Sequence, residues 1–569
     1  MLFPVSKLLL ALVPEIVLAA PPAKRWGQQY HEQDQKGAVA SESAVCSKIG
    51  VNLIKDGGNA ADALVGTVFC IGVIGMYHSG LGGGGFMIVR GSNGSYEFID
   101  FRETAPAAAF EDMYKDNVNA SIYGGLASGV PGEVRGLEYL HKNYGKLPWE
   151  HVMKPAIKVA RNGFTVTQDL VNQEKSAVAG LDNFLLQDPG FAIDFAPNGT
   201  LLGLNETITR RRYADTLEAI SKRGADAFYT GPIANATIQA LQAVNGTMTL
   251  DDLKNYTVAI RKPATVDYRD YKLTACSAPS SGEVALSVMK KIEGYGDIGQ
   301  PSTTNLSTHR LDEAIRFAYG ERAKLGDPAF VPGLDEYQNE MLNETTAEIV
   351  RSKISDTETL DVKAYDPSEL ISLELGSTSH IVTGDASGMA ISLTTTVNLL
   401  FGSHLIVPET GVIMNNEMND FSIPGSSNSF GYTPSPANYI RPGKRPLSSI
   451  SPTIVEHKSN NSLYYVIGSA GGSRIITATI QNLWNVLDRG DNVKQSLARP
   501  RLHDQLAPNQ VSFEYTYDNE TTAFMKSLGH NVTWVAPGQS TAQGLRRLYN
   551  GTFEAAGEPR QKASAGFAV

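Results

Sequence analysis

The sequence predicts a single interwoven α+β body with layered sheets, and three observations support this class. Strand-like runs gather toward the two ends of the chain, near residue 86, before residue 276 and after residue 378. The middle of the chain instead carries helical patterns that are opened or closed by Gly, Pro or Asn. No repeat and no long linker interrupts the 569 residues, so we expect one body although this length would allow three or four domains.

Helices are predicted where apolar residues recur with the helical period of about 3.6 residues. Two such segments lie near the N-terminus. One carries Ala44, Ile49, Leu53 and Ile54 on one face, and the other runs from Asn59 into ADALVGTVFCIGVIGM. Further helical patterns occur at 131–162, 211–223, 282–294 and 307–324.

Strands are predicted where apolar and polar residues alternate between turn sequences. The runs are FMIVR and YEFIDF near residue 86, ATVDYRDYKLTAC before residue 276, and then HIVTG, MAISLTTTV, PTIVEH and LYYVIGS. Asp-Ala-Ser-Gly at 385–388 is a good turn sequence, so HIVTG and MAISLTTTV are expected to form a hairpin. Thr378 stands at the head of this hairpin, where a threonine ordinarily serves as a β-branched packing residue.

Composition places the chain among ordinary soluble globular proteins, with 42% hydrophobic residues, 19% charged residues and no transmembrane run. The formal net charge is −10, and Lys and Arg are scattered, which argues against nucleic acid as a partner because a phosphate-binding face concentrates positive charge. The three cysteines, Cys46, Cys70 and Cys276, supply neither a disulfide framework nor a zinc cluster. One pair is possible in an oxidising compartment, and spacing alone does not choose it.

The N-terminus has the features of a signal peptide over residues 1–20. Lys7 precedes an apolar run, and the small residues Val17, Ala19 and Ala20 precede a proline pair. Pro14 and Glu15 interrupt that run, so a disordered leader or a retained short anchor stays open as the alternative. The chain also carries thirteen Asn-x-Ser/Thr acceptors where chance predicts roughly four or five, which favours a glycosylated secretory protein. Extracellular, cell-surface and vacuolar destinations all remain open.

Two segments resemble binding motifs without fulfilling their structural context. Residues 80–85, Gly-Leu-Gly-Gly-Gly-Gly, satisfy G-x-G-x-x-G, but a nucleotide fingerprint needs a strand before it and a helix after it, and here the strand FMIVR follows. We interpret these glycines as a tight turn. HEQDQ at 31–35 has no second histidine at metal-ligand spacing and is interpreted as a solvated charged stretch.

The second half of the chain carries separate candidates for the parts of a hydrolase site. Asn-Asn-Glu-Met-Asn-Asp at 415–420 places two carboxylates three residues apart, suited to holding an ammonium group. Arg-Pro-Leu-Ser-Ser at 445–449 offers two adjacent hydroxyls, and Gly-Ser-Ala-Gly-Gly at 468–472 could present backbone N–H groups to an oxyanion. Taken singly, each segment is equally consistent with a surface pair or a turn.

Together these ordered motifs resemble the γ-glutamyltranspeptidases, which are N-terminal-nucleophile hydrolases. The resemblance runs from about Gly37 to the C-terminus and rests on DGGNAADA, HSGLGGGGF, DFRETAP, SGVPG, STSH, TTTVN, NNEMNDF, RPLSSISPTIV and GSAGGSRI. It implies a four-layer αββα sandwich formed by two chains, residues 21–377 and 378–569, that arise from one precursor and remain together as a heterodimer. It implies no metal and no organic cofactor.

The same resemblance implies that the precursor cuts itself between Ser377 and Thr378, so that the threonine becomes a new N-terminus. A threonine inside a peptide has a weakly nucleophilic hydroxyl and no free α-amine to act as a base. A freed threonine carries its own α-amine, whose pKa of about 8 suits proton transfer near neutral pH. The resemblance therefore assigns nucleophile and base to one residue, Thr378.

Site residues are carried over by matching motifs. Arg102 corresponds to the clamp on the glutamate α-carboxylate, with Ser448 and Ser449 as further donors. The expected ammonium cage is Asn398, Glu417 and Asp420. The expected oxyanion donors are the amides of Gly471 and Gly472, and Thr396 is expected to steady Thr378. The loop 422–443, with Phe430 near its middle, corresponds to a lid that Phe430 would close loosely because it cannot donate a hydrogen bond to Asn398.

The implied reaction is cleavage of γ-glutamyl amide bonds, with glutathione as the donor, through an acyl-enzyme that water or an amino acid or dipeptide then takes. Alternatives are a related acylase, for instance one that acts on glutaryl β-lactams, a glutamyl hydrolase with little transfer, and a catalytically weak surface binding protein. Members of this family from animals also imply a Cys46–Cys70 disulfide, which would leave Cys276 as a free thiol.

Overall fold

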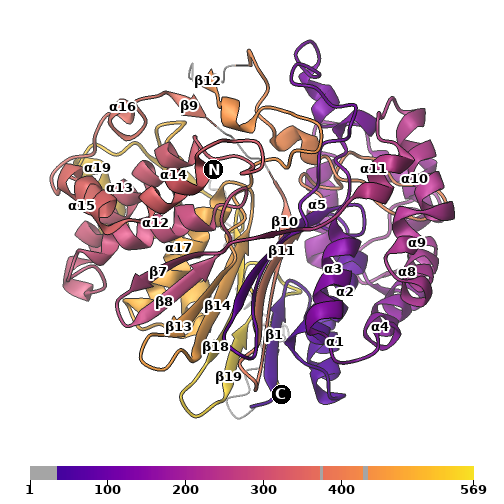
Figure 1. Ribbon diagram of the computed structural model, residues 1–569, viewed down its shortest axis with the longest axis horizontal. Coiled ribbons are helices and arrows are strands. Elements are labelled where there is room, and N and C mark those ends of the chain that lie inside the picture. Colours follow the sequence, from indigo (N-terminus) through magenta and orange to yellow (C-terminus); the bar gives the residue numbers. More distant parts are fainter. Residues whose placement is uncertain (1–34, 372–375, 427–432) are drawn as a thin grey trace, which may run out of the picture.

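The computed structural model describes residues 35–371, 376–426 and 433–569. The predicted signal peptide and Phe430 of the predicted lid lie outside this part of the chain. Two mainly antiparallel sheets face one another, and helices cover the outer face of each (Figure 1). The predicted four-layer αββα sandwich is therefore confirmed.

The first sheet combines both ends of the chain with its centre. Its strand order is β20 (Ala565–Ala568), β1 (Gly37–Ser41), β10 (Thr378–Asp385), β11 (Ala390–Thr396), β2 (Gly84–Arg90), β3 (Tyr96–Asp100) and β6 (Ala259–Arg261). The predicted hairpin is present as β10 and β11, with Thr378 opposite Thr396. Because β10 lies between β1 and β11, Thr378 begins an interior strand.

The second sheet packs against the first mainly through its central strands. Its order is β19 (Phe553–Ala556), β18 (Thr541–Arg547), β14 (Leu463–Ala470), β13 (Thr453–His457), β8 (Tyr271–Ala275) and β7 (Ala264–Tyr268). β14 contacts both β10 and β11 across the interface. The layer between the sheets is apolar, and buried residues such as Phe86, Val382 and Leu545 fill it.

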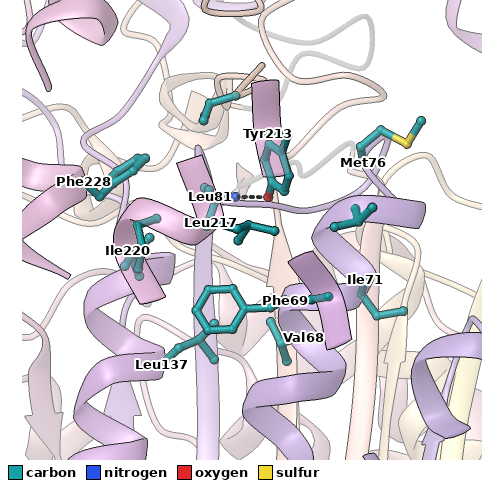
Figure 2. Packing of buried hydrophobic residues seen from close by; sticks show 14 of the residues in the cluster. Val68, Phe69, Ile71, Met76, Leu81, Leu137, Tyr213, Leu217, Ile220 and Phe228 are labelled. Atoms are coloured by element: carbon teal, nitrogen blue, oxygen red, sulfur yellow. Dashed lines mark hydrogen bonds between the residues drawn. The ribbon is translucent and has the colours of Figure 1, made fainter. Parts of the chain in front are cut away.

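The outer helices of the first sheet include α1 (Ala44–Lys55), α2 (Ala60–Ile74), α4 (Trp149–Asn162) and α8 (Arg211–Arg223). α2 begins with a capping box in which Asn59 and Asp62 bond each other's backbone N–H groups. All fifteen of its residues are buried, because α2 lies between the sheet and the outer helices. Figure 2 shows Phe69 of α2 beside Leu217 and Ile220 of α8.

The outer helices of the second sheet include α12 (Gly282–Glu293) and α13 (Thr304–Arg322), which lie close to the predicted ranges, and α17 (Arg474–Leu487), which was not predicted. The predicted pattern at 131–162 is two helices, α3 (Glu133–Tyr144) and α4. Gly145 ends the first, and Pro148 precedes the second, since its restricted backbone φ favours a helix start over a helix interior.

The predicted disulfide is confirmed. Cys46 of α1 and Cys70 of α2 are joined, with their Cα atoms 5.4 Å apart, and Cys276 is a buried free thiol. Within the described ranges, no helix is long and apolar enough to cross a membrane.

Candidate active site

One end of the first sheet gathers residues that are distant in sequence. Thr378 begins β10 and is paired with Thr396, the last residue of β11, which is paired in turn with Gly84 at the start of β2. β3 ends at the same edge, at Asp100, and Arg102 follows two residues later. Antiparallel strands alternate in direction, so the start of one strand lies beside the end of its neighbour. The register therefore brings Thr378, Thr396 and the Arg102 segment to one edge.

The peptide bond before Thr378 is held from two sides in the uncut chain. Ser377 donates its N–H to the carbonyl of Asn398 at 2.6 Å, and its carbonyl oxygen accepts a hydrogen bond from Thr396 Oγ1 at 3.0 Å. Thr396 Oγ1 itself accepts the Asn398 N–H at 2.7 Å, which directs the hydroxyl proton toward Ser377. Thr378 is 4% exposed. Thr396 therefore contacts the Ser377 carbonyl, which Thr378 would attack during self-cleavage.

The face of β10 that carries Thr378 looks toward the second sheet. His380 shares that face, because side chains alternate along a strand, and it packs so closely on Gly468 that an added Cβ there would lie 2.2 Å from its ring. Burial lowers the pKa of His380 to about 3, so this histidine is neutral near pH 7 and is no cationic partner for the site. Its Nδ1 lies 2.8 Å from Thr394 Oγ1.

The two glycines predicted to bind the oxyanion follow β14 directly, on the side that Thr378 faces. Gly471 and Gly472 have φ angles of 125° and 59°, a region that L side chains rarely adopt. A Cβ added to Gly376 would lie 3.7 Å from the Cα atom of Gly472 and 3.3 Å from Asn398 Oδ1. The glycine turn and Asn398 therefore both border the segment that would be cut.

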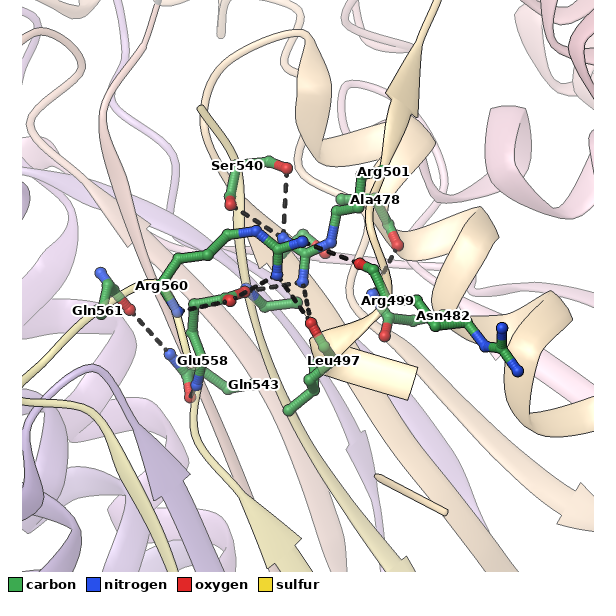
Figure 3. Close-up of polar contacts among 12 residues, drawn as sticks. Ala478, Asn482, Leu497, Arg499, Arg501, Ser540, Gln543, Glu558, Arg560 and Gln561 are labelled. Carbon is green, nitrogen blue, oxygen red and sulfur yellow. Dashed lines mark hydrogen bonds and ion pairs between the residues drawn. The ribbon is translucent and has the colours of Figure 1, made fainter. Parts of the chain in front are cut away.

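Figure 3 shows an ion-pair network around Ser540, a residue that lies next to Gly471 of the glycine turn. Arg501 donates to the carbonyl of Ser540 at 2.9 Å and pairs with Glu558 at 2.7 Å. The segment 539–540 lies against Gly471, where an added Cβ would be 2.5 Å from the carbonyl oxygen of Gln539. The buried Arg501–Glu558 pair thus fixes the backbone on which Gly471 rests.

The predicted clamp and the predicted ammonium cage meet directly. Arg102 donates a hydrogen bond from one guanidinium nitrogen to Glu417 and from another to Asp420. All three side chains are at most 2% exposed. Glu417 and Asp420 are the first and last residues of a single 3₁₀ turn, which presents both carboxylates to the same guanidinium. Burial raises the pKa of the neighbouring Glu103 to about 8, so its carboxyl is mostly protonated at pH 7.

The remaining predicted residues surround this centre. Asn398 donates its side-chain amide to the carbonyl of Asn416 at 3.0 Å, which joins it to the 415–420 segment. Ser448 and Ser449 are fully buried. Ser448 donates its N–H to the carbonyl of Pro279 at 2.8 Å. The carbonyl of Ser448 accepts a hydrogen bond from the Ser281 hydroxyl at 2.6 Å.

Asn438 was not singled out from the sequence, and it links two parts of the site. It donates to the carbonyl of Asp420 at 2.7 Å and accepts the N–H of Leu447 at 2.9 Å. The loop of the two carboxylates is thereby tied to the segment of the two serines. A lone asparagine in a Gly-, Ser- and Pro-rich loop carries no sequence signal for this role.

A cavity of about 360 Å³ opens beside the cleavage point. Its wall includes Tyr77, Ser377, Thr378, Gly471 and Gln539. The lining is largely polar, so the cavity suits a polar leaving group or a second substrate better than an apolar one.

Comparison with known proteins gives matches along nearly the whole chain. Residues 46–568 match the family model described as gamma-glutamyltranspeptidase. The chain is 57% identical over 553 residues to a glutathione hydrolase proenzyme from Arthroderma benhamiae, across 95% of this chain and 94% of that protein. It is 34% identical over 556 residues to a glutathione hydrolase proenzyme from Escherichia coli, across 95% of this chain and 94% of that protein.

Solved structures agree on the fold. The chain superposes on cephalosporin acylase from Bacillus halodurans with a TM-score of 0.83 and 24% identity, across 97% of this chain and 99% of that one. It superposes on Helicobacter pylori gamma-glutamyltranspeptidase with a TM-score of 0.53 and 30% identity, across 56% of this chain and 92% of that one.

Proposed function

The chain belongs to the γ-glutamyltranspeptidase family, and we propose that it cleaves the γ-glutamyl amide bond of glutathione and related γ-glutamyl compounds after cutting itself before Thr378. The observation that carries the proposal is the buried Arg102 between Glu417 and Asp420, at the sheet edge where Thr378 begins its strand. These groups match the two charges of a glutamyl head group, and Thr378 supplies the nucleophile.

The charge pattern explains how the donor binds. A γ-glutamyl donor carries an α-carboxylate and an α-ammonium on one carbon, so it can enter between Arg102 and the two carboxylates and take a partner on each side. The donor's carboxylate then pairs with the Arg102 guanidinium in place of one acidic side chain. The donor's ammonium pairs with the acidic side chain that was displaced. Because each ion pair lost is replaced by another, no charge is left buried without a partner. Asn398, Ser448 and Ser449 supply neutral hydrogen-bonding groups around the same head group.

The reaction then follows from the position of Thr378. Its α-amine accepts the hydroxyl proton as Oγ1 attacks the γ-carbonyl, and the amides of Gly471 and Gly472 bind the resulting oxyanion. The C–N bond breaks, the amine proton passes to the leaving nitrogen, and a γ-glutamyl ester remains on Thr378. Water or the amine of an amino acid or dipeptide attacks this ester and restores the free threonine. The cavity beside Thr378 offers room for this second substrate.

A glutaryl acylase is the second candidate, because the fold is shared with a cephalosporin acylase. A glutaryl group has no α-ammonium, so it would leave Glu417 and Asp420 without a cationic partner from the substrate. The paired carboxylates therefore favour γ-glutamyl donors. A binding protein of weak activity is disfavoured because the threonine, the glycine turn and the charged centre are all in place.

The test is an assay of purified protein with a γ-glutamyl anilide, with and without glycylglycine, and in parallel with a glutaryl anilide. We expect release of the aniline from the γ-glutamyl compound, faster release with glycylglycine, and little release from the glutaryl compound. Preference for the glutaryl compound would assign the protein to the acylases. No release from either compound by self-cleaved protein would contradict both.

Replacing Arg102 with Lys should weaken donor binding without preventing self-cleavage. Lysine keeps the positive charge but loses the planar fork that spans two carboxylates. We expect donor KM to rise roughly 10- to 150-fold, which corresponds to about 1.5–3 kcal/mol. Donor titration of the matured variant measures this change.

The matched control is Arg90→Lys. Arg90 lies at the far end of β2 and also forms a buried ion pair, with Glu456 at 2.7 Å. This variant reports what the loss of a buried fork does to stability alone. If Arg102→Lys and Arg90→Lys change donor KM equally, Arg102 is not part of the donor pocket.

We also propose that the protein enters the secretory pathway, with residues 1–20 removed and several asparagines glycosylated. Twelve of the thirteen acceptor asparagines are exposed: Asn93, Asn119, Asn198, Asn205, Asn235, Asn245, Asn255, Asn343, Asn460, Asn519, Asn531 and Asn550. Asn305 is half-buried and accepts a hydrogen bond from Thr521 at 2.8 Å. Exposure is what attachment of a bulky glycan requires.

Nine acceptors precede Thr378 and four follow it. Enzymatic removal of N-linked glycans from protein made in its own host should therefore shorten both chains on a gel. N-terminal sequencing should place the start of the large chain near Pro21. Unshifted chains that still begin at Met1 would exclude this route.

A further inference from the structure

A buried cluster of ionisable side chains lies in the outer helical layer of the second sheet. His309, Asp312, Glu313 and Arg316 are on successive turns of α13, and His530 follows α19 (Asn519–Ser527), which packs on α13 (Figure 1). All five are at most 4% exposed. The proposed reaction uses none of them.

The two imidazole rings face each other through one nitrogen each. His309 Nε2 lies 2.6 Å from the carbonyl oxygen of Ser355, which only accepts, so this nitrogen carries the proton and Nδ1 has a lone pair. His530 Nδ1 lies 3.1 Å from a carboxylate oxygen of Asp312, a contact that lacks the geometry of a hydrogen bond. The two remaining nitrogens are 2.8 Å apart. The pair is held together by a proton on His530 Nε2, or by a metal ion that takes the place of that proton.

A third potential ligand faces the same point. Oε1 of Glu313 is 3.9 Å from His530 Nε2, and the ligand atoms of His309, Glu313 and His530 all lie within 4.8 Å of one another. Thr359 and Tyr365 donate to Glu313 Oε1 at 2.7 and 2.8 Å and orient its carboxylate. Two histidines and one carboxylate are a ligand set that binds zinc in proteins.

The charges of the cluster also call for a cation. Arg316 pairs with the buried Asp504 at 2.7 Å, so it compensates one carboxylate. Asp312 and Glu313 are two further carboxyl groups beside the histidines, and both are fully buried. Within the described ranges, no hydrogen bond of good geometry reaches either oxygen of Asp312. A divalent ion would supply positive charge next to both carboxyl groups.

We propose that His309 Nδ1, His530 Nε2 and Glu313 hold a structural zinc ion. Ser355 and Asp312 then bind the second nitrogens of the two histidines, an arrangement that orients histidine ligands in metal sites. Nitrogen ligands about 2.0–2.1 Å from a tetrahedral zinc are about 3.3 Å apart, so the two rings would separate by about 0.5 Å. The fourth position would be taken by water.

The site would join the two mature chains. His309 and Glu313 precede Thr378 in sequence, and His530 follows it, so after self-cleavage the ligands belong to different chains. This consequence rests on the proposed cleavage, whereas zinc binding does not. The uncut Thr378→Ala variant should bind zinc as the wild type does, which separates failure of one proposal from failure of the other.

Metal content tests the site on the full-length protein. Wild type is expressed with zinc as the only added metal, dialysed, and measured by elemental mass spectrometry, and we expect about one zinc per chain pair. His309→Asn and Glu313→Gln should lose the zinc. Asp312→Asn keeps all three ligands and should weaken zinc binding about 10- to 100-fold. The control is His151→Asn, an exposed histidine next to Asp56 on the other side of the molecule, which should retain full zinc content.

Measurements on wild type alone keep the proposal falsifiable if the variants fold poorly. Adding a strong chelator should lower Tm and promote dissociation of the two chains, and added zinc should restore both. Zinc below 0.1 per chain pair, together with a Tm that does not respond to chelator or zinc, would overturn the proposal and leave a hydrogen bond between His309 Nδ1 and His530 Nε2. Zinc that persists in His309→Asn would also overturn it.

Discussion

Replacing Thr378 with Ala is expected to leave the protein as one uncut chain with no γ-glutamyl activity. The hydroxyl is the attacking group in both steps, because self-cleavage needs it on the Ser377 carbonyl and turnover needs it on the donor. The uncut chain also lacks the free α-amine that acts as base. Gel analysis should show a single chain, while wild type shows a small chain of residues 378–569 whose first residue is Thr378.

The control is Thr378→Ser, which keeps a hydroxyl and differs by one methyl group. It should still cut itself, and N-terminal sequencing should find the serine at the new terminus. Cleavage before residue 378 in the alanine variant would remove the threonine from the role of nucleophile. Full activity of an uncut chain would remove the α-amine from the role of base.

Replacing Thr396 with Val should slow self-cleavage by about 10²–10³-fold. In the uncut chain the Thr396 hydroxyl donates to the Ser377 carbonyl at 3.0 Å, and this oxygen gains negative charge when Thr378 attacks. Removing one donor to a developing oxyanion typically slows the reaction by this factor. Valine keeps the β-branched shape in β11. The rate at which the precursor disappears, followed on gels after synthesis, measures the change.

Thr396 also accepts the Asn398 N–H at 2.7 Å, so the valine variant loses some stability by leaving that group without its partner. Thermal unfolding of a Thr378→Ala background, which cannot cut itself, measures this loss separately. Thr396→Ser restores the hydroxyl and should restore most of the rate. A valine variant that matures at the wild-type rate would show that the hydroxyl does not assist the cleavage.

Local pattern was sufficient for the elements with a clear apolar period. The strands near residue 86, the hairpin at Thr378 and the helices α8, α12 and α13 lie close to their predicted ranges, because each has a clear apolar period and a turn or cap at its ends. The short strands β1, β19 and β20 were not predicted. They are rich in Ala and Gly, so their strand conformation comes from pairing with neighbours and leaves little periodic signal.

The members of the candidate site were also readable from the sequence, through the resemblance of ordered motifs. What the sequence left out is their mutual contacts. Arg102 lies 315 residues from Glu417, and nothing local indicates that clamp and cage pair directly before a donor arrives. The contact of Thr396 with the Ser377 carbonyl and the bridge made by Asn438 were likewise absent from the prediction.

By itself, then, the sequence indicated the family through its ordered short motifs, and the resemblance to that family implied the sandwich fold, the Cys46–Cys70 pair and the candidate site residues. The tertiary structure decided which side chains form ion pairs and which carbonyl accepts the hydrogen bond of Thr396. It also brings His309 and Glu313 of α13 next to His530, which is 221 residues from His309. These contacts depend on strand register and helix packing between distant segments. A hydrogen bond or ion pair needs its atoms within about 3–4 Å, and only the folded chain sets distances on that scale.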